Sequence, residues 1–361
     1  LLRKMGDIVP TKTSMLSKFP CSLVAEWLAT MGFPAKEGDV SAPEGKAPPE
    51  AVTDADCKAL LETLGARSEG ELAEAGFEPL TVGFANRVFA TKRQGQALVL
   101  KRYTDLVFLR LEPEAIGAVD ALAGQVGLGP QVLYSSPSGL VMTRLEGRTL
   151  EEADMHKGDL ELLGSVARAL AELHGLPAPK VSEGEPMLWR TVDKMLEVAA
   201  GRPDLLPEEG VPGMGPVLVE VMRAKQALAG RKPKVVTGHG DFKPTNVMFH
   251  QGSAKLIDFE LGGPNYRGFD LMKVFRTAKN FSEPCMRHFL RAYLEHSGEA
   301  CGEEDVEELV AEARAFEPLT WLEAAVFFLT LPQFKPENTS KWHNLAADRW
   351  ARFQETKFRL Q

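Results

Sequence analysis

The sequence predicts an α+β protein with two lobes, a small lobe of antiparallel strands followed by a larger helical lobe. Strand-like runs occupy residues 80–90 and 97–101, and the short turn between them, at 93–96, is typical of a hairpin. Strongly periodic helical patterns follow at 159–174 and 187–199, each ended by Gly or Pro. At 361 residues the chain exceeds one average domain, so it has room for both lobes and an extension.

Residues 1–75 precede the strands, and we interpret them as a helical extension of unknown role. Helical patterns occur at 22–31 and 54–64, and a Pro- and Gly-rich linker separates them at 40–49. We expect the extension to pack on the lobe behind it, while a separate interaction module is the alternative.

The other elements of the two lobes follow in order. We expect a helix at 112–123, then strands at 131–134 and 140–145 around a turn at 135–139. The lobes should join after the second of these strands. The resulting domains are 76–146 for the N-lobe and 147–361 for the C-lobe.

Composition limits the partners that such a body could have. Hydrophobic residues at 44% and charged residues at 25% are ordinary for a globular protein. The net charge of −8 offers no basic field for nucleic acid or an anionic membrane, so a small ligand is expected. Four sparse cysteines favour free thiols in a reducing compartment, and we expect a cytoplasmic protein without a membrane span. A homodimer is possible. A removed targeting segment also stays open, because the sequence begins with Leu.

The most informative segment reads HGDFKPTN at 239–246 and LIDFE at 256–260. Asn246 lies five residues after Asp241, and Asp258 lies seventeen residues after it. A short loop followed by a strand hairpin could therefore bring an amide oxygen and a carboxylate onto the Mg²⁺ that carries ATP. We predict that Asp241 is the catalytic base and that Asn246 and Asp258 bind the metal. Asp-Phe-Glu in place of Asp-Phe-Gly points away from protein substrates.

Residues of the N-lobe offer matching contacts for a nucleotide. Gly83 and Asn86 lie in the first hairpin turn, where backbone N–H groups could approach phosphate oxygens, although an ordinary turn explains them too. Lys101 ends an apolar strand, where a kinase needs a cation beside the α- and β-phosphates. Glu114 is the expected partner of this lysine, and Glu112 competes for that role.

From about residue 77 to the end, the chain resembles the choline/ethanolamine kinase family, within the aminoglycoside-phosphotransferase-like kinases. The motifs that carry the resemblance lie at 83–86, 99–103, 128–130, 147–150, 171–174, 239–246, 257–260 and 265–270. The resemblance implies a protein-kinase-like fold with ATP between the lobes. It also implies that the γ-phosphate passes to the hydroxyl of a small amino alcohol, of the ethanolamine or choline type, as in phospholipid biosynthesis. By position, the main chain from Met142 to Leu145 should contact adenine. Asp270, a short carboxylate before an apolar helical pattern, should cap the start of that helix and tie it to the catalytic loop.

The acceptor site departs from the pattern of this family. Choline kinases hold a quaternary ammonium with aromatic faces and carboxylates. In this family an aromatic residue normally follows the segment that corresponds to 257–260, and this chain has Leu261 there. An acidic–aromatic pair is expected a few residues after 267–270, and this chain has Arg276 in that region. Glu260 remains the best anionic anchor, and Tyr266, Trp321 and Trp342 are candidate walls of the site, although tryptophans at helical spacing are more often core residues.

These departures make choline itself doubtful as the acceptor. Ethanolamine or another amino alcohol is expected, and an aminoglycoside-like or sugar-like acceptor stays open. A protein kinase is disfavoured, because no Ala-Pro-Glu follows the Asp-Phe-Glu. A pseudokinase that only binds its ligands is the remaining alternative.

Overall fold

The computed structural model describes residues 52–82, 86–109, 115–179, 185–202, 213–276 and 281–360, all within one compact unit that spans Pro49–Gln361. Several sequence predictions lie outside the described residues: the helix at 22–31, the linker at 40–49, Gly83, and both Glu112 and Glu114.

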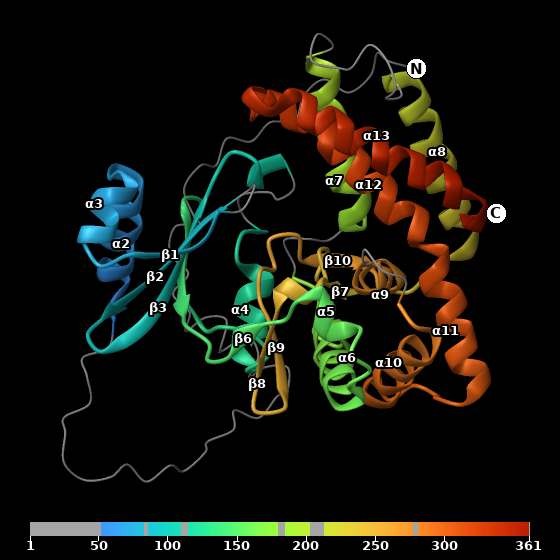
Figure 1. The fold of residues 1–361 in the computed structure, drawn as a ribbon, viewed down its shortest axis with the longest axis horizontal. Coiled ribbons are helices and arrows are strands. Elements are labelled where there is room, and N and C mark those ends of the chain that lie inside the picture. The colour runs from blue at the N-terminus through green and yellow to red at the C-terminus, as the bar shows by residue number, and fades with distance from the viewer. Residues whose placement is uncertain are drawn as a thin grey trace, which may run out of the picture. The chain divides into compact units, whose positions relative to one another are not determined.

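The N-lobe is a five-stranded antiparallel sheet in the order β1-β2-β3-β5-β4. Helices α2 and α3, drawn in blue in Figure 1, lie on one side of this sheet. The two hairpins of the sequence analysis are confirmed. The elements of the N-lobe are α2 (Asp54–Ala66), α3 (Glu69–Glu74), β1 (Glu78–Val82), β2 (Asn86–Arg93), β3 (Gln96–Tyr103), a 3-10 turn (Val107–Leu109), α4 (Ala118–Gln125), β4 (Val132–Ser136) and β5 (Gly139–Thr143).

Helix α2 begins where its sequence predicts. The Thr53 side chain accepts a hydrogen bond from the Asp56 backbone N–H at 3.2 Å, and the Asp56 carboxylate accepts one from the Thr53 backbone N–H, which forms a capping box. Leu61 and Leu64 of this helix are buried against the sheet, together with Leu98 and Leu100. The described part of the extension thus packs on the N-lobe and shares its core.

Alternation along β3 decides where Lys101 points. Successive side chains of a strand lie on opposite faces of the sheet. Leu98 and Leu100 face α2, while Val99 and Tyr103 pack in the main core on the other face. Lys101 shares that second face, which is turned toward the C-lobe, and only 4% of its surface is exposed.

The helix expected at 112–123 begins later than predicted, at Ala118. Gly117 precedes it with a φ of 73°, in the left-handed region that breaks helical continuity. A Cβ atom on Gly117 would lie 2.8 Å from the Leu140 Cδ2 atom, so the close approach of this turn to β5 also requires glycine.

The C-lobe is mainly helical, with one two-stranded sheet, β10-β7, and one three-stranded sheet, β6-β8-β9. Helix α6 packs on α10, and α12 packs on α13. The predicted helices at 159–174 and 187–199 are confirmed as α6 and α7, and Asp159 is the N-cap of α6. The elements of the C-lobe are β6 (Arg148–Thr149), α5 (Glu152–Met155), α6 (Leu160–His174), α7 (Met187–Gly201), α8 (Met214–Arg231), β7 (Val235–Gly238), β8 (Val247–His250), β9 (Ser253–Leu256), β10 (Gly263–Tyr266), α9 (Arg267–Phe275), α10 (Glu283–Ser297), α11 (Glu303–Ala315), α12 (Glu317–Thr330) and α13 (Thr339–Thr356).

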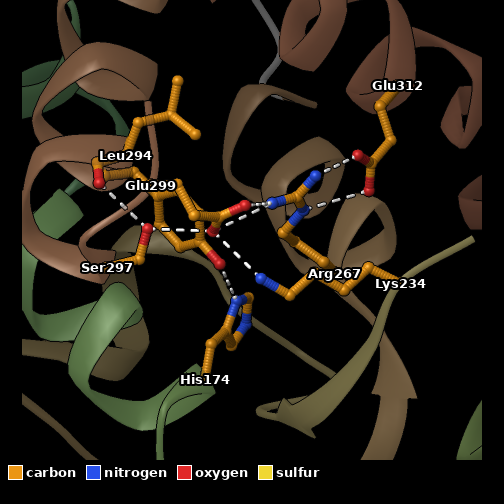
Figure 2. A network of polar contacts seen from close by, with 8 residues as sticks. His174, Lys234, Arg267, Leu294, Ser297, Glu299 and Glu312 are labelled. Carbon is orange, nitrogen blue, oxygen red and sulfur yellow. Dashed lines mark hydrogen bonds and ion pairs between the residues drawn. The ribbon is translucent and has the colours of Figure 1, made fainter. Parts of the chain in front are cut away.

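A polar network fixes the first residue of α9 to the helices around it (Figure 2). The Arg267 guanidinium pairs with Glu299 at 2.9 Å and also with Glu312. Glu299 in turn accepts from Lys234 at 3.0 Å and from the Ser297 hydroxyl at 2.9 Å. Burial alone would raise the pKa of Glu299, but these three donors outweigh it and hold the pKa below its usual value. The start of α9 is therefore held to α11, to the segment after α10 and to the residue before β7.

Two smaller expectations concern membranes and thiols. Within the described ranges, every helix is too short or too polar to cross a bilayer. Cys57, Cys285 and Cys301 are free thiols, as expected, whereas Cys21 lies outside the described residues.

Candidate functional site

A tight loop after β7 presents Asp241. Gly240, just before it, has a φ of 78°, and a Cβ atom there would lie 2.2 Å from the Leu261 carbonyl oxygen. Only glycine fits this turn. The Asn246 side-chain amide, at the end of the following 3-10 turn (Pro244–Asn246), donates to the Asp241 carbonyl at 3.0 Å. The loop between Asp241 and Asn246 is therefore closed on itself.

Asp270 binds the backbone of the same loop. Its carboxylate accepts from the backbone N–H groups of His239 at 2.6 Å and Gly240 at 2.8 Å, and it lies 3.1 Å from His174 Nε2. The predicted tie to the catalytic loop is confirmed. The predicted N-cap is wrong, because α9 is capped by Tyr266 and Asp270 is its fourth residue. The carboxylate therefore accepts hydrogen bonds from the loop, and not from the first turn of its own helix.

The hairpin of β8 and β9 places Asp258 beside Asn246. Val247 pairs with Leu256 across the hairpin, and the Ile257 N–H donates to the Asn246 carbonyl at 3.0 Å. His239 braces the next peptide, with Nε2 3.0 Å from the Ile257 carbonyl oxygen. Asp258 follows with a φ of 71°, a conformation that non-glycine residues adopt rarely and that clusters at functional sites.

Lys101 reaches the C-lobe and contacts two carboxylates there. Its ammonium pairs with Asp258, and it lies 3.6 Å from Glu260. Asn86 also donates to Glu260. Burial lowers the pKa of the Lys101 ammonium, but the two carboxylates outweigh it and raise the pKa well above its usual value. Lys101 therefore stays charged.

One acidic residue of this region escaped the sequence analysis. Asp120, in the first turn of α4, is 4% exposed and interacts electrostatically with Lys101. Burial raises the pKa of Asp120, while the lysine opposes that rise. The available signal was a single charge within the apolar run at 115–123.

Two lysines flank the carboxylate of Asp241. Lys243 Nζ lies 2.7 Å from one carboxylate oxygen, and Lys273 Nζ lies 3.6 Å from the other. Burial lowers the pKa of Lys243, but the attraction of Asp241 outweighs it and raises that pKa. Lys273 is also 3.1 Å from Glu323 of α12. The sequence analysis missed Lys273, although a lysine within the apolar helix at 269–275 was a signal.

The predicted walls of the acceptor site differ in their surroundings. Trp342 is 2% exposed, stacks on Phe328, and donates to the Lys335 carbonyl at 3.0 Å. This is the environment of a core residue, and it does not support the prediction that Trp342 lines the acceptor site. The Tyr266 hydroxyl accepts from Trp189 Nε1 at 3.2 Å. Trp321 is half-buried, with the Arg276 guanidinium 4.5 Å from its ring centroid.

Three further residues are predicted contacts of the acceptor or the nucleotide: Glu260, Met142 and Leu145. Glu260 contacts Lys101 and Asn86, which both lie on strands of the N-lobe. Met142 lies in the middle of the sheet, paired with Val99 of β3, while Leu145 follows the end of the strand. The position of Leu145 is thus the better suited of the two to an adenine contact.

The oxygens around Asn246 and Asp258 suit a magnesium ion. Mg²⁺ prefers carboxylate and amide oxygens and usually completes its shell with phosphates and water. The Asn246 nitrogen is turned to the Asp241 carbonyl, which directs its side-chain oxygen the other way. The Asp258 carboxylate is 32% exposed and therefore accessible. The donor set fits the ion, and the ammonium of Lys101 pairs with the same Asp258 carboxylate.

Comparison with solved structures defines the class of fold. The ethanolamine kinase of Plasmodium vivax superposes with a TM-score of 0.70 at 14% identity, over 88% of this chain and 98% of that one. The predicted protein-kinase-like α+β fold with two lobes is confirmed.

The sequence matches the model of the Phosphotransferase enzyme family (APH) over residues 76–305, and the chain belongs to this family. It is 26% identical to a probable ethanolamine kinase of Arabidopsis thaliana over 58% of the chain and 59% of that protein. It is also 26% identical to choline/ethanolamine kinase of Rattus norvegicus over 54% of the chain and 52% of that protein. The chain thus spans between half and six tenths of these relatives.

Proposed function

We propose that the protein is a small-molecule kinase that uses ATP and Mg²⁺ to phosphorylate the hydroxyl of a small amino alcohol, of the ethanolamine or choline type. One observation carries the proposal. Lys101 of the N-lobe meets Asp258 and Glu260 of the C-lobe next to the loop that holds Asp241. In this proposal Lys101 would be the phosphate-binding cation, Asp258 the metal-binding carboxylate and Asp241 the base, and their closeness supports these roles.

The reaction is a direct in-line displacement. The acceptor oxygen forms a bond to the γ-phosphorus while the bond from that phosphorus to the bridging oxygen breaks, and ADP leaves with the electron pair. The hydroxyl proton passes to the Asp241 carboxylate. Asp241 orients the acceptor, and Asp270 keeps the loop in place through His239 and Gly240.

Charge is neutralised by side chains on both sides of the reacting phosphate. Lys101 would hold the α- and β-phosphates, and Lys243, beside Asp241, is placed to approach the group in transfer. Mg²⁺ bound by Asn246 and Asp258 would supply further positive charge to the phosphate oxygens. Positioning and electrostatic stabilisation account for most of the expected rate.

Asp241→Asn tests the assignment of the base. We expect kcat to fall by about 10²- to 10⁴-fold with nearly unchanged ATP affinity, because only proton transfer is lost. ADP release with ethanolamine, choline, an aminoglycoside and a sugar would be measured for both proteins. Asp305→Asn, on the surface of α11, is the control and should keep full activity.

The outcomes separate the alternatives. Asp241→Asn with most of its activity would show that another group accepts the proton. ATP binding without ADP release for every acceptor would favour the pseudokinase. Phosphorylation of the sugar or the aminoglycoside alone would favour the second candidate, an acceptor of another type. Leu261 and Arg276, which depart from the acceptor-site pattern of the choline/ethanolamine kinases, support that candidate. A cytoplasmic location and a homodimer stay predictions.

A further inference from the structure

Three arginines converge on one tryptophan. The guanidinium carbons of Arg276, Arg352 and Arg349 lie 4.5, 5.2 and 5.4 Å from the centroid of the Trp321 ring. Arg276 ends α9, Trp321 belongs to α12, and the other two arginines belong to α13. We call Arg276, Arg349 and Arg352 the arginine cluster.

The arginine cluster lies next to the catalytic base. Lys273 is one helical turn before Arg276 on α9, and its ammonium is 3.6 Å from an Asp241 carboxylate oxygen. Lys273 is also 3.1 Å from Glu323, which is two residues from Trp321 on α12. Arg276 itself donates to the Thr320 carbonyl. Helices α9 and α12 thereby bring the base and the cluster to adjacent positions.

Positive charge around the cluster is only partly compensated. Asp348 pairs with Arg349 and lies 3.5 Å from Arg352 Nε, so one carboxylate serves two arginines. Glu323 contacts Lys273, and Asp241 contacts Lys243 and Lys273. Burial lowers the pKa of Arg276, and Arg349 and Arg352 lower it further, against the attraction of Glu323 and Asp241. Like charges held this close are stabilised by an added anion.

The face of Trp321 is already covered by cations of the protein. A quaternary ammonium needs a bare aromatic face within about 6 Å, and here guanidinium groups take that place. A guanidinium also presents a planar set of donors that matches a carboxylate or a phosphate in two parallel hydrogen bonds. The chemistry at this wall therefore suits an oxyanion.

We infer that the arginine cluster binds an oxyanion of the acceptor, so that the substrate is a hydroxyl compound, amino alcohols included, that also carries a carboxylate or a phosphate. The inference rests on the proposed transfer of the γ-phosphate to a hydroxyl, and it changes the expected acceptor, because ethanolamine and choline themselves carry no acidic group. The hydroxyl lies at Asp241, and the acidic group of the same molecule lies at Arg276, Arg349 and Arg352.

The test compares acceptors that differ by one acidic group. Ethanolamine is paired with L-serine, and glycerol is paired with D-glycerate and with glycerol 3-phosphate, which separates carboxylate from phosphate. The variant is the double substitution Arg349→Gln with Arg352→Gln, since both side chains lie on the outer part of α13 and Arg276 is more deeply packed. The control is Arg314→Gln on α11, a surface arginine 42% exposed that pairs with Glu283.

In the supporting result, the wild-type protein has a kcat/KM at least about 10-fold higher for the acidic member of one of these pairs. The double variant then lowers kcat/KM for that acceptor by about 10- to 100-fold, mainly through KM, because two charged hydrogen-bond donors are lost. Its rate with the partner that lacks the acidic group and its affinity for ATP stay within about 2-fold, and Arg314→Gln changes neither.

A wild-type preference for ethanolamine over L-serine and for glycerol over both of its acids overturns the inference and leaves the proposed function standing. So does an acidic preference that the double variant retains. If no acceptor is phosphorylated, the proposed function fails, and calorimetric binding of D-glycerate and glycerol 3-phosphate decides the oxyanion site alone. Binding that the double variant loses supports the site, and binding that is absent or unchanged overturns it.

Discussion

Asp270→Asn should cost about 2–4 kcal/mol of the free energy of unfolding. The wild-type carboxylate, fully buried, accepts from two backbone N–H groups at 2.6 and 2.8 Å and contacts His174 at 3.1 Å. The amide keeps one acceptor oxygen and turns a donor toward one of these N–H groups. A buried donor left without an acceptor costs about 1–3 kcal/mol, and the lost charge of the acceptor weakens the remaining bond.

Urea denaturation of the full chain would measure this loss, with a check that the m-value is unchanged. Asp305→Asn is the matched control, because its carboxylate accepts a single backbone N–H, that of Gly302 at 2.8 Å, at the surface. We expect the control to lose about 1 kcal/mol or less. Equal losses in the two variants, or a loss below about 1 kcal/mol in Asp270→Asn, would refute the reasoning that the hydrogen bonds from Asp270 to the loop of Asp241 stabilise the fold.

Two further predictions concern charged contacts. Lys101→Met should weaken ATP binding by about 10-fold or more, because the phosphates lose a buried cation, and unchanged affinity in a nucleotide titration would contradict its role. Glu299→Gln should lower the free energy of unfolding by about 1 kcal/mol at pH 7, through its pairs with Arg267 and Lys234. The folded-state pKa of Glu299 is lowered, so its stabilisation is present above the unfolded pKa of about 4.3 and is lost as the pH falls through the folded value. The difference between the two proteins should therefore shrink toward pH 3, and a constant difference would argue against the network in Figure 2.

Local features of the chain were readable from the sequence because their causes are local. Helices were predicted at 54–64 and 159–174, and in the structure α2 and α6 begin directly after their N-caps, Thr53 and Asp159, whose side chains reach only three residues ahead. The spacing from Asp241 to Asn246 predicted a short loop, and a hydrogen bond between the two residues closes it in the structure. Lys101 was predicted on a strand, and it lies on β3.

Contacts between distant segments could not be read in the same way. Lys273 and Glu323 meet because α9 packs on α12, and Arg349 reaches Trp321 because α13 packs on α12. Helix packing depends on complementary surfaces that no local pattern records. For the same reason Asp270 was expected to cap its own helix, whereas the fold places its carboxylate under a loop thirty residues earlier.

Helix α9 also sets a length. Lys273 contacts Asp241, the proposed base, and Arg276 follows three residues later on the same helix, a rise of about 4.5 Å. When the helix shifts, both residues shift together, so the interval between them is preserved. If the inferred oxyanion site is right, an acceptor that reaches from Asp241 to Arg276 must match that interval, which favours compact molecules of a few carbon atoms over extended ones.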